Sequence, residues 1–169
     1  MPVVIVEGVD GSGKSTFVER IAAKLREETD ANVITAHKGV PESDSMLVEY
    51  FDPLKALGPN DVLVADRWHV GEMVYGPLYR GESKMKPIIG SFEKFLDEID
   101  AVRIVMAPTL ELVVHRLKSR GEDYLQPGHV RHVWEFYNAY AQVFDYYKLS
   151  DPNDEDLDYV VSQVKDQLA

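Results

Sequence analysis

Short apolar runs alternate along the chain with stretches of helical periodicity. The runs predict strands over 3–6, 32–36, 62–65, 102–106 and 147–149. Between them, apolar residues recur at spacings of three and four, which is typical of helices that bury one face. Alternating strands and helices favour a parallel sheet that is covered on both faces. We therefore expect an α/β fold with a parallel five-stranded sheet flanked by helices.

The helical patterns cover most of the remaining chain. They predict helices over 16–24, 43–57, 92–99, 109–120, 130–146 and 157–168. Pro53 weakens the second of these, and the glycines and prolines of 71–90 predict an irregular or mobile segment after a short helical start. The chain shows no repeat, low-complexity segment or linker, so we expect one domain over 1–169.

The first predicted strand runs directly into a glycine-rich loop. Residues 8–15 read GVDGSGKS and fit the phosphate-binding pattern G-x-x-x-x-G-K-[ST]. A strand, this loop and a helix bring backbone N–H groups and a helix N-terminus onto one polyphosphate. The alternative interpretation is a glycine-rich turn before an ordinary helix, and the strand and helix on either side of the loop favour the phosphate site. The loop predicts an ATP site of the P-loop NTPase fold. Its expected residues are Gly8, Asp10, Gly11, Ser12, Gly13, Lys14, Ser15 and Thr16.

Charged side chains follow three of the predicted strands, namely Glu7 beside the glycine-rich loop, His37 with Lys38, and Asp66 with Arg67. They suggest how a phosphoryl group is transferred. Lys14 is expected to neutralise the β- and γ-phosphates, and Ser15 to hold Mg²⁺. Asp66 follows the third strand, where a carboxylate orients Mg²⁺ or its water molecules. Arg67 is then expected to grip a phosphate between donor and acceptor. An ion pair at a strand end is the alternative interpretation of Asp66 and Arg67.

A cationic cluster ends the helix predicted over 109–120. Arg116 and Arg120 are four residues apart and share a helical face, and a polar loop follows them. We interpret 116–128 as a lid that brings arginine onto the transferring group and expels water. The same cations also suit a helix C-terminus, and both interpretations can hold.

The second strand is followed by His37 and Lys38. A hydroxyl acceptor benefits from a carboxylate base at this position, whereas an acceptor that already carries a phosphate needs cations. His37 and Lys38 therefore favour a phosphorylated acceptor. Asp10 and Asp66 remain open as bases for a hydroxyl.

Composition excludes several classes of protein. The chain has no cysteine, which rules out disulfides and thiolate metal sites. Its net charge is −11. An acidic surface disfavours polymeric nucleic acid and anionic membranes. No signal peptide fits the N-terminal strand, and no apolar run reaches the roughly 20 residues that span a bilayer. We expect a cytoplasmic protein.

With these motifs, the chain resembles the thymidylate kinase family of P-loop nucleoside monophosphate kinases, particularly its short phage-type members. VEGVDGSGKST over 6–16 is similar to the family's phosphate loop, and DRW over 66–68 followed by Tyr75-Gly76 is similar to its DR[YFHW] segment. The stretch 100–106, Pro108, Glu111, Arg116 and 120–123 is similar to its strand, helix and lid. The resemblance reaches to about residue 147.

The resemblance implies roles for individual residues. Arg67 would bind the acceptor's phosphate, and Asp10 and Tyr75 would lie near the acceptor. Ser12 stands where some members have arginine, so the lid would supply the catalytic cation, with Arg116 and Arg120 as candidates. Among the aromatic residues, Tyr50 or Phe51 would stack on the base, and each fits the core equally well. The resemblance also implies a homodimer.

Two departures limit the resemblance. HKGVP over 37–41 replaces the family's arginine-proline-glycine segment. The helix before the third strand is also shorter by roughly two or three turns than the family's base pocket needs. The resemblance therefore supports phosphoryl transfer better than thymine selectivity.

Taken together, the sequence predicts a Mg²⁺-dependent kinase of nucleotide biosynthesis that transfers the γ-phosphate of ATP to a deoxynucleoside monophosphate. Its acceptor would be dTMP or a related pyrimidine nucleotide. A kinase that phosphorylates a deoxynucleoside or another small-molecule hydroxyl is the first alternative. A regulatory module that binds a nucleotide without turnover is the second. A kinase that acts on bases within DNA is disfavoured by the acidic charge.

Overall fold

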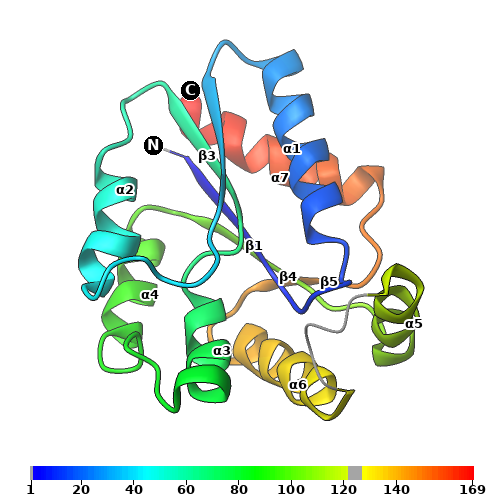
Figure 1. Cartoon of the computed structure of the whole chain (residues 1–169). Coiled ribbons are helices and arrows are strands. Elements are labelled where there is room, and N and C mark those ends of the chain that lie inside the picture. Colours follow the sequence, from blue (N-terminus) through cyan, green and yellow to red (C-terminus); the bar gives the residue numbers. More distant parts are fainter. Residues whose placement is uncertain (1, 122–126) are drawn as a thin grey trace.

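One parallel sheet forms the centre of the molecule. The computed structural model describes residues 2–121 and 127–169. Within them, the strands are β1 (Val3–Glu7), β2 (Asn32–His37), β3 (Asp61–Asp66), β4 (Val102–Met106) and β5 (Tyr147–Leu149). Their order is β2-β3-β1-β4-β5, and every neighbouring pair is parallel (Figure 1). The five-stranded parallel sheet predicted from the apolar runs is confirmed.

Helices cover both faces of this sheet. They are α1 (Lys14–Glu28), the π-helix η1 (Leu47–Phe51), α2 (Asp52–Lys55), α3 (Val70–Arg80), α4 (Ile89–Glu98), α5 (Leu110–Arg120), α6 (Pro127–Val143) and α7 (Asp154–Leu168). Helices α1 and α7 lie together on one face, and η1, α2, α3, α4 and α6 cover the other (Figure 1). Among the described helices, none has the length and apolar character that crossing a bilayer requires.

The central strand β1 is buried along its whole length because it has a neighbour on each side and helices above and below. Val4 and Val6 pack against α1 and α7, whereas Val3 and Ile5 pack against the opposite helices. This alternation follows from the two-residue period of a strand. Because both faces of β1 are covered, its residues form an unbroken apolar run. Glu7 ends this strand, at the edge of the sheet where the glycine-rich loop begins.

Two segments differ from the pattern-based prediction. The helix expected over 43–57 is confined to η1 and α2, over 47–55. In 71–90, the expected short helical start is instead a full helix, α3, which continues past Pro77 to Arg80. Gly76 makes room for the chain that folds back over this helix, since a Cβ there would lie 2.7 Å from the carbonyl oxygen of Glu82.

The other helices start and stop close to the predicted positions. Thr109 caps α5, where its hydroxyl oxygen accepts the N–H of Leu112, as the sequence predicts. Helix α7 begins three residues earlier than expected, at a reciprocal pair of hydrogen bonds between Asn153 and Asp156.

Candidate functional site

The glycine-rich loop connects β1 to α1 in a conformation suited to an anion. Gly8, Gly11 and Gly13 all have positive φ, and α1 starts directly after Gly13. A Cβ on Gly8 would lie 2.7 Å from the carbonyl oxygen of Met106, so no larger residue fits. Successive N–H groups of such a loop converge with the helix N-terminus on one point.

Lys14 is buried in the loop. Its ammonium group donates a hydrogen bond to the carbonyl oxygen of Val9 at 2.9 Å. Burial, together with the charge of Arg67, lowers the pKa of Lys14 to about 8. A bound polyphosphate would favour the charged form again, because an opposite charge at short range raises the pKa of a lysine.

Ser15 and Asp66 meet below the loop, as the metal-site prediction requires. The Ser15 hydroxyl donates to Asp66 Oδ2 at 2.5 Å, and His37 Nδ1 lies 3.6 Å from the same oxygen. The other carboxylate oxygen, Oδ1, is buried without a partner in the described residues. Hard oxygen donors of this kind fit Mg²⁺, which takes one or two protein ligands and completes its shell with phosphate and water. Ser15 and Asp66 are therefore the residues that would hold it.

Arg67 lies across from the loop, and its own backbone is strained. Its φ is 66°, in the left-handed region that side chains other than glycine rarely adopt. The guanidinium forms an ion pair with Asp10 and lies 5.4 Å from the ring centroid of Tyr75. The structure thus brings together Asp10, Arg67 and Tyr75, the residues that the resemblance assigned to the acceptor.

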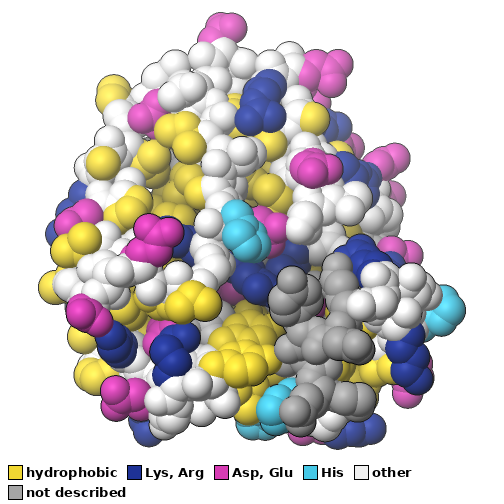
Figure 2. All heavy atoms as spheres, viewed as in Figure 1, with side chains coloured by type: hydrophobic (Ala, Val, Ile, Leu, Met, Phe, Trp, Pro, Cys, Tyr) yellow, Lys and Arg dark blue, Asp and Glu magenta, His cyan; other side chains and the backbone are white. Residues whose placement is uncertain are grey.

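Unpaired polar atoms concentrate at this edge of the sheet. Ser12 Oγ, Asp66 Oδ1, Arg67 Nε and Tyr75 OH are buried and have no hydrogen-bond partner in the described residues. Each such atom costs about 1–3 kcal/mol if it stays unpaired. Cationic side chains and a histidine also gather near the middle of the face shown in Figure 2. Together, these features indicate a site built for a polar, anionic ligand.

A cavity of about 280 Å³ lies beside the loop. Its lining comes from the loop, α1, β4, α5 and the segment after β5. The lining residues are Ser12, Gly13, Thr16, Phe17, Arg20, Met106, Arg116, Arg120, Ser150, Asp151 and Pro152. Arg116 donates to the carbonyl oxygen of Gly11 at 3.2 Å, so one of the two candidate arginines already touches the loop. Residues 122–126 of the predicted lid lie outside the described part of the chain.

No protein-family model and no curated protein sequence matches the chain. Among solved structures, it is similar to the YorR protein of Bacillus subtilis in complex with phosphorylated GDP, with a TM-score of 0.67 and 20% identity over 96% of this chain and 93% of that one. It is also similar to polyphosphate kinase 2 of Arthrobacter aurescens, with a TM-score of 0.65 and 17% identity over 99% of this chain and 67% of that one. This chain has the P-loop NTPase fold. At these identities the likeness concerns the fold, and thymidylate kinase is not singled out.

The sequence predicts two free cations, His37 and Lys38, after β2, but in the structure Lys38 is paired. Lys38 forms an ion pair with Glu49 at 2.7 Å and lies 5.3 Å from the ring of Trp68. Burial acts to raise the pKa of Glu49, but Lys38 and the N–H of Ser43 hold that pKa below its ordinary value. The charge of Lys38 is thus largely compensated within the protein. His37, whose side chain is 61% exposed, remains open to a ligand.

The aromatic residues considered for base stacking lie mainly in the core. Tyr50 is 1% exposed. Phe51 packs against Phe92 and Phe95, with ring centroids 4.5 and 5.1 Å apart. None of these contacts directs Phe51 toward Arg67 or Asp10. Stacking of Phe51 on the base of an acceptor nucleotide stays a prediction, and the packing of Phe51 does not support it.

Two buried carboxylates lie near the site, of which sequence reasoning noted Glu7 without giving it a role and missed Glu49. Glu49 lies on η1, and its contact with Lys38 arises only when η1 packs beside Trp68. Glu7 offered a sequence signal, because a carboxylate that ends a fully apolar strand needs hydrogen-bond donors at its buried position.

Proposed function

We propose that this protein is a Mg²⁺-dependent nucleotide kinase that transfers the γ-phosphate of ATP to a nucleoside monophosphate, with dTMP or a related pyrimidine deoxynucleotide as acceptor. The observation that carries the proposal is the position of Arg67. A buried guanidinium with an unpaired Nε faces the phosphate-binding loop from the neighbouring strand. Two anion sites that face each other are what transfer between two phosphates requires.

On the donor side, the P-loop N–H groups and Lys14 would bind the β- and γ-phosphates, while Ser15 and Asp66 would hold the metal. When bound there, Mg²⁺ supplies positive charge to the phosphate oxygens. The cavity lined by Phe17, Met106 and Arg116 would take the nucleoside of ATP.

On the acceptor side, Arg67 has donors to spare. A guanidinium carries five N–H groups, of which Asp10 engages only part. The remaining donors suit a monophosphate bound in line with the γ-phosphate. Lys14, Arg67 and a lid arginine (Arg116 or Arg120) would then stabilise the charge that develops during transfer.

A nucleoside acceptor is the second candidate. Glu49 compensates Lys38, which weakens the cationic character of the acceptor side, and Asp10 provides a carboxylate near Arg67 that could take a proton from a hydroxyl.

One experiment separates these candidates. The purified protein is incubated with ATP, Mg²⁺ and a panel of nucleosides and nucleoside monophosphates, and the products are scored by mass. We expect diphosphates from deoxynucleoside monophosphates, with dTMP or another pyrimidine nucleotide preferred. Phosphorylation of thymidine but not of dTMP would establish the second candidate. No phosphorylated product with any acceptor would contradict both.

A further inference from the structure

The turn that follows β3 holds Arg67 in a conformation that it would not adopt alone. A left-handed backbone is unfavourable at a residue other than glycine. The N–H of Arg67 donates to the carbonyl oxygen of Val6 at 2.9 Å, which ties the turn to the end of β1. Further contacts must hold the chain on the far side of Arg67.

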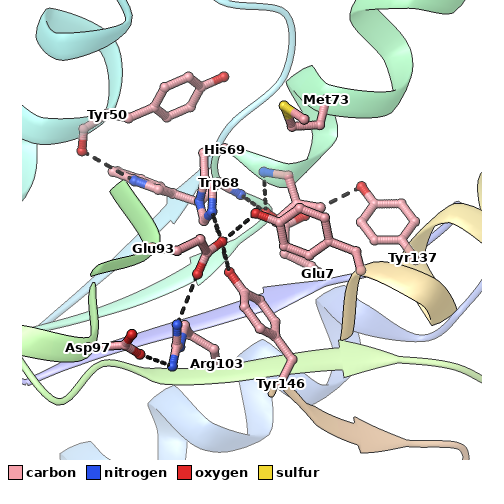
Figure 3. A network of polar contacts seen from close by, with 12 residues as sticks. Glu7, Tyr50, Trp68, His69, Met73, Glu93, Asp97, Arg103, Tyr137 and Tyr146 are labelled. Carbon is pink, nitrogen blue, oxygen red and sulfur yellow. Dashed lines mark hydrogen bonds and ion pairs between the residues drawn. The ribbon is translucent and has the colours of Figure 1, made fainter. Parts of the chain in front are cut away.

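Glu7 supplies those contacts (Figure 3). Its Oε1 accepts the backbone N–H of Trp68 at 2.8 Å and that of Val70 at 3.2 Å, and its Oε2 accepts the hydroxyl of Tyr137 at 3.4 Å. The Glu7 side chain is completely buried. One carboxylate thus joins the central strand to the turn, to the start of α3 and to α6.

A carboxylate at this position has a cost that calls for an explanation. Burial raises the pKa of Glu7 even though His69 and the N–H of Trp68 favour its charged form. Within the described residues, no lysine or arginine forms an ion pair with it. An apolar residue would suit the core strand better, so the hydrogen bonds of Glu7 and the nearby charge of Arg67 must offset the cost of burying this carboxylate.

The next residues of the turn are anchored separately. Trp68 donates its indole N–H to the carbonyl oxygen of Tyr50 at 3.3 Å. His69 is completely buried, and its Nε2 lies 2.7 Å from Oε1 of Glu93. The Glu93 carboxylate also accepts hydrogen bonds from Tyr146 and Arg103 (Figure 3). These contacts direct the side chains at 68 and 69 into the core, while Arg67 turns the opposite way, toward Asp10 and Tyr75.

We propose that Glu7 is a positioning residue for the acceptor: by accepting the N–H groups of Trp68 and Val70, it keeps Arg67 in the left-handed conformation that directs its guanidinium at the acceptor's phosphate. The proposal rests on the proposed function for its kinetic readout. It differs from a charge effect of Glu7 on Lys14, because hydrogen-bond acceptance and not charge is the active property.

Three variants test this difference. Glu7→Gln keeps a carbonyl oxygen for both N–H groups and an amide that donates to Tyr137, but loses the charge. Glu7→Ala loses all three contacts, and Glu7→Asp is one methylene too short to keep them all. The matched control is Glu72→Ala, which removes another buried carboxylate that pairs with Arg80 and accepts the N–H of Lys84.

The Michaelis constants for acceptor and ATP are measured separately for each variant. Glu7→Ala removes the hydrogen bonds that the Glu7 carboxylate accepts. We therefore expect the KM for the phosphoryl acceptor to rise about tenfold or more, and the KM for ATP to change less than about threefold. Glu7→Gln should keep both constants within about threefold of wild type, and Glu7→Asp should lie between. Glu72→Ala should leave the acceptor's KM unchanged. Equal losses in Glu7→Gln and Glu7→Ala, or an unchanged acceptor KM in Glu7→Ala, would overturn the proposal.

A second readout needs no activity. Amide hydrogen exchange at Trp68 and Val70, followed by NMR, should be slow in wild type and in Glu7→Gln and about tenfold faster in Glu7→Asp. Unprotected amides in wild type would overturn the positioning role even if the protein is a kinase. Protected amides in a protein without kinase activity would instead overturn the proposed function alone. If Glu7→Ala does not fold, Glu7→Asp and Glu7→Gln still decide.

Discussion

The hydroxyl of Ser15 lies 2.5 Å from the carboxylate of Asp66, although 51 positions separate these residues along the chain. The contact exists because β1 and β3 are neighbours, with Val6 opposite Asp66 in the ladder. The pairing of these two strands therefore brings the glycine-rich loop beside the carboxylate that we propose as a Mg²⁺ ligand.

Asp66→Asn should impair metal-dependent turnover. The amide oxygen can still accept the Ser15 hydroxyl, but it lacks the negative charge that Mg²⁺ prefers. We expect kcat to fall by about 10- to 100-fold and to recover partly at high Mg²⁺ concentration. The check is a Mg²⁺ titration of initial rates. Asp61→Asn, at the opposite end of β3, is the control, and equal rates in wild type and Asp66→Asn would contradict the assignment.

Lys14→Ala should abolish most phosphoryl transfer while the protein stays folded. One preorganised charge at a transferring group is worth about 10²–10³ in kcat. Circular dichroism and thermal unfolding establish that the variant is folded, and Lys24→Ala, which removes a lysine of the same helix that pairs with Asp158, serves as the comparison. Turnover close to that of wild type would refute the kinase proposal.

Lys14 should also make stability depend on pH in the absence of nucleotide. Its pKa is about 8 in the folded protein and 10.5 in the unfolded chain, so between these values the unfolded state binds more protons. The free energy of unfolding must then rise with pH, by about 2 kcal/mol from pH 8 to about 9.5. Below pH 8 both states are charged and the slope vanishes. Urea unfolding of wild type and Lys14→Met gives the difference, and parallel pH profiles would contradict this prediction.

Replacing Arg67 separates backbone strain from the function of its side chain. Arg67→Ala and Arg67→Gly both lose the guanidinium and should both raise the acceptor's KM. Because φ is 66°, we expect the glycine variant to be more stable than the alanine variant by about 1 kcal/mol, the reverse of the order in a helix. Ser162→Ala and Ser162→Gly in α7 provide the helical order for comparison. The same order at both positions would show that the turn is unstrained.

Lys38→Met should act on stability more than on acceptor binding. Its ammonium group is paired with Glu49, and removing it leaves a largely buried carboxylate without its partner. We expect a loss of about 1–3 kcal/mol in the free energy of unfolding and a change below about threefold in the acceptor's KM. An increase in that KM as large as the one in Arg67→Ala would return Lys38 to the acceptor site.

The sequence predicts the conformation around the glycine-rich loop well because that part of the fold is local. A strand, a glycine-rich loop and a helix occupy consecutive residues, and Asp66 is found by counting to the end of an apolar run. The surroundings of Lys38 and Arg67 depend on contacts between distant segments. Glu49 reaches Lys38 only through the packing of η1, which no spacing reveals. Helix α3 continues past Pro77 because Gly76 and Glu72 accommodate the chain that folds back at 82–84, so tertiary contacts override the local signals.

The order of β1 and β3 in the sheet also affects how the protein is made. During synthesis the glycine-rich loop leaves the ribosome before Asp66 and Arg67, which follow it by some fifty residues. Tyr137, which holds the far side of the Glu7 carboxylate, comes later still. Because domains generally fold as units, we expect the contacts around Arg67 to form together with the core and not before it.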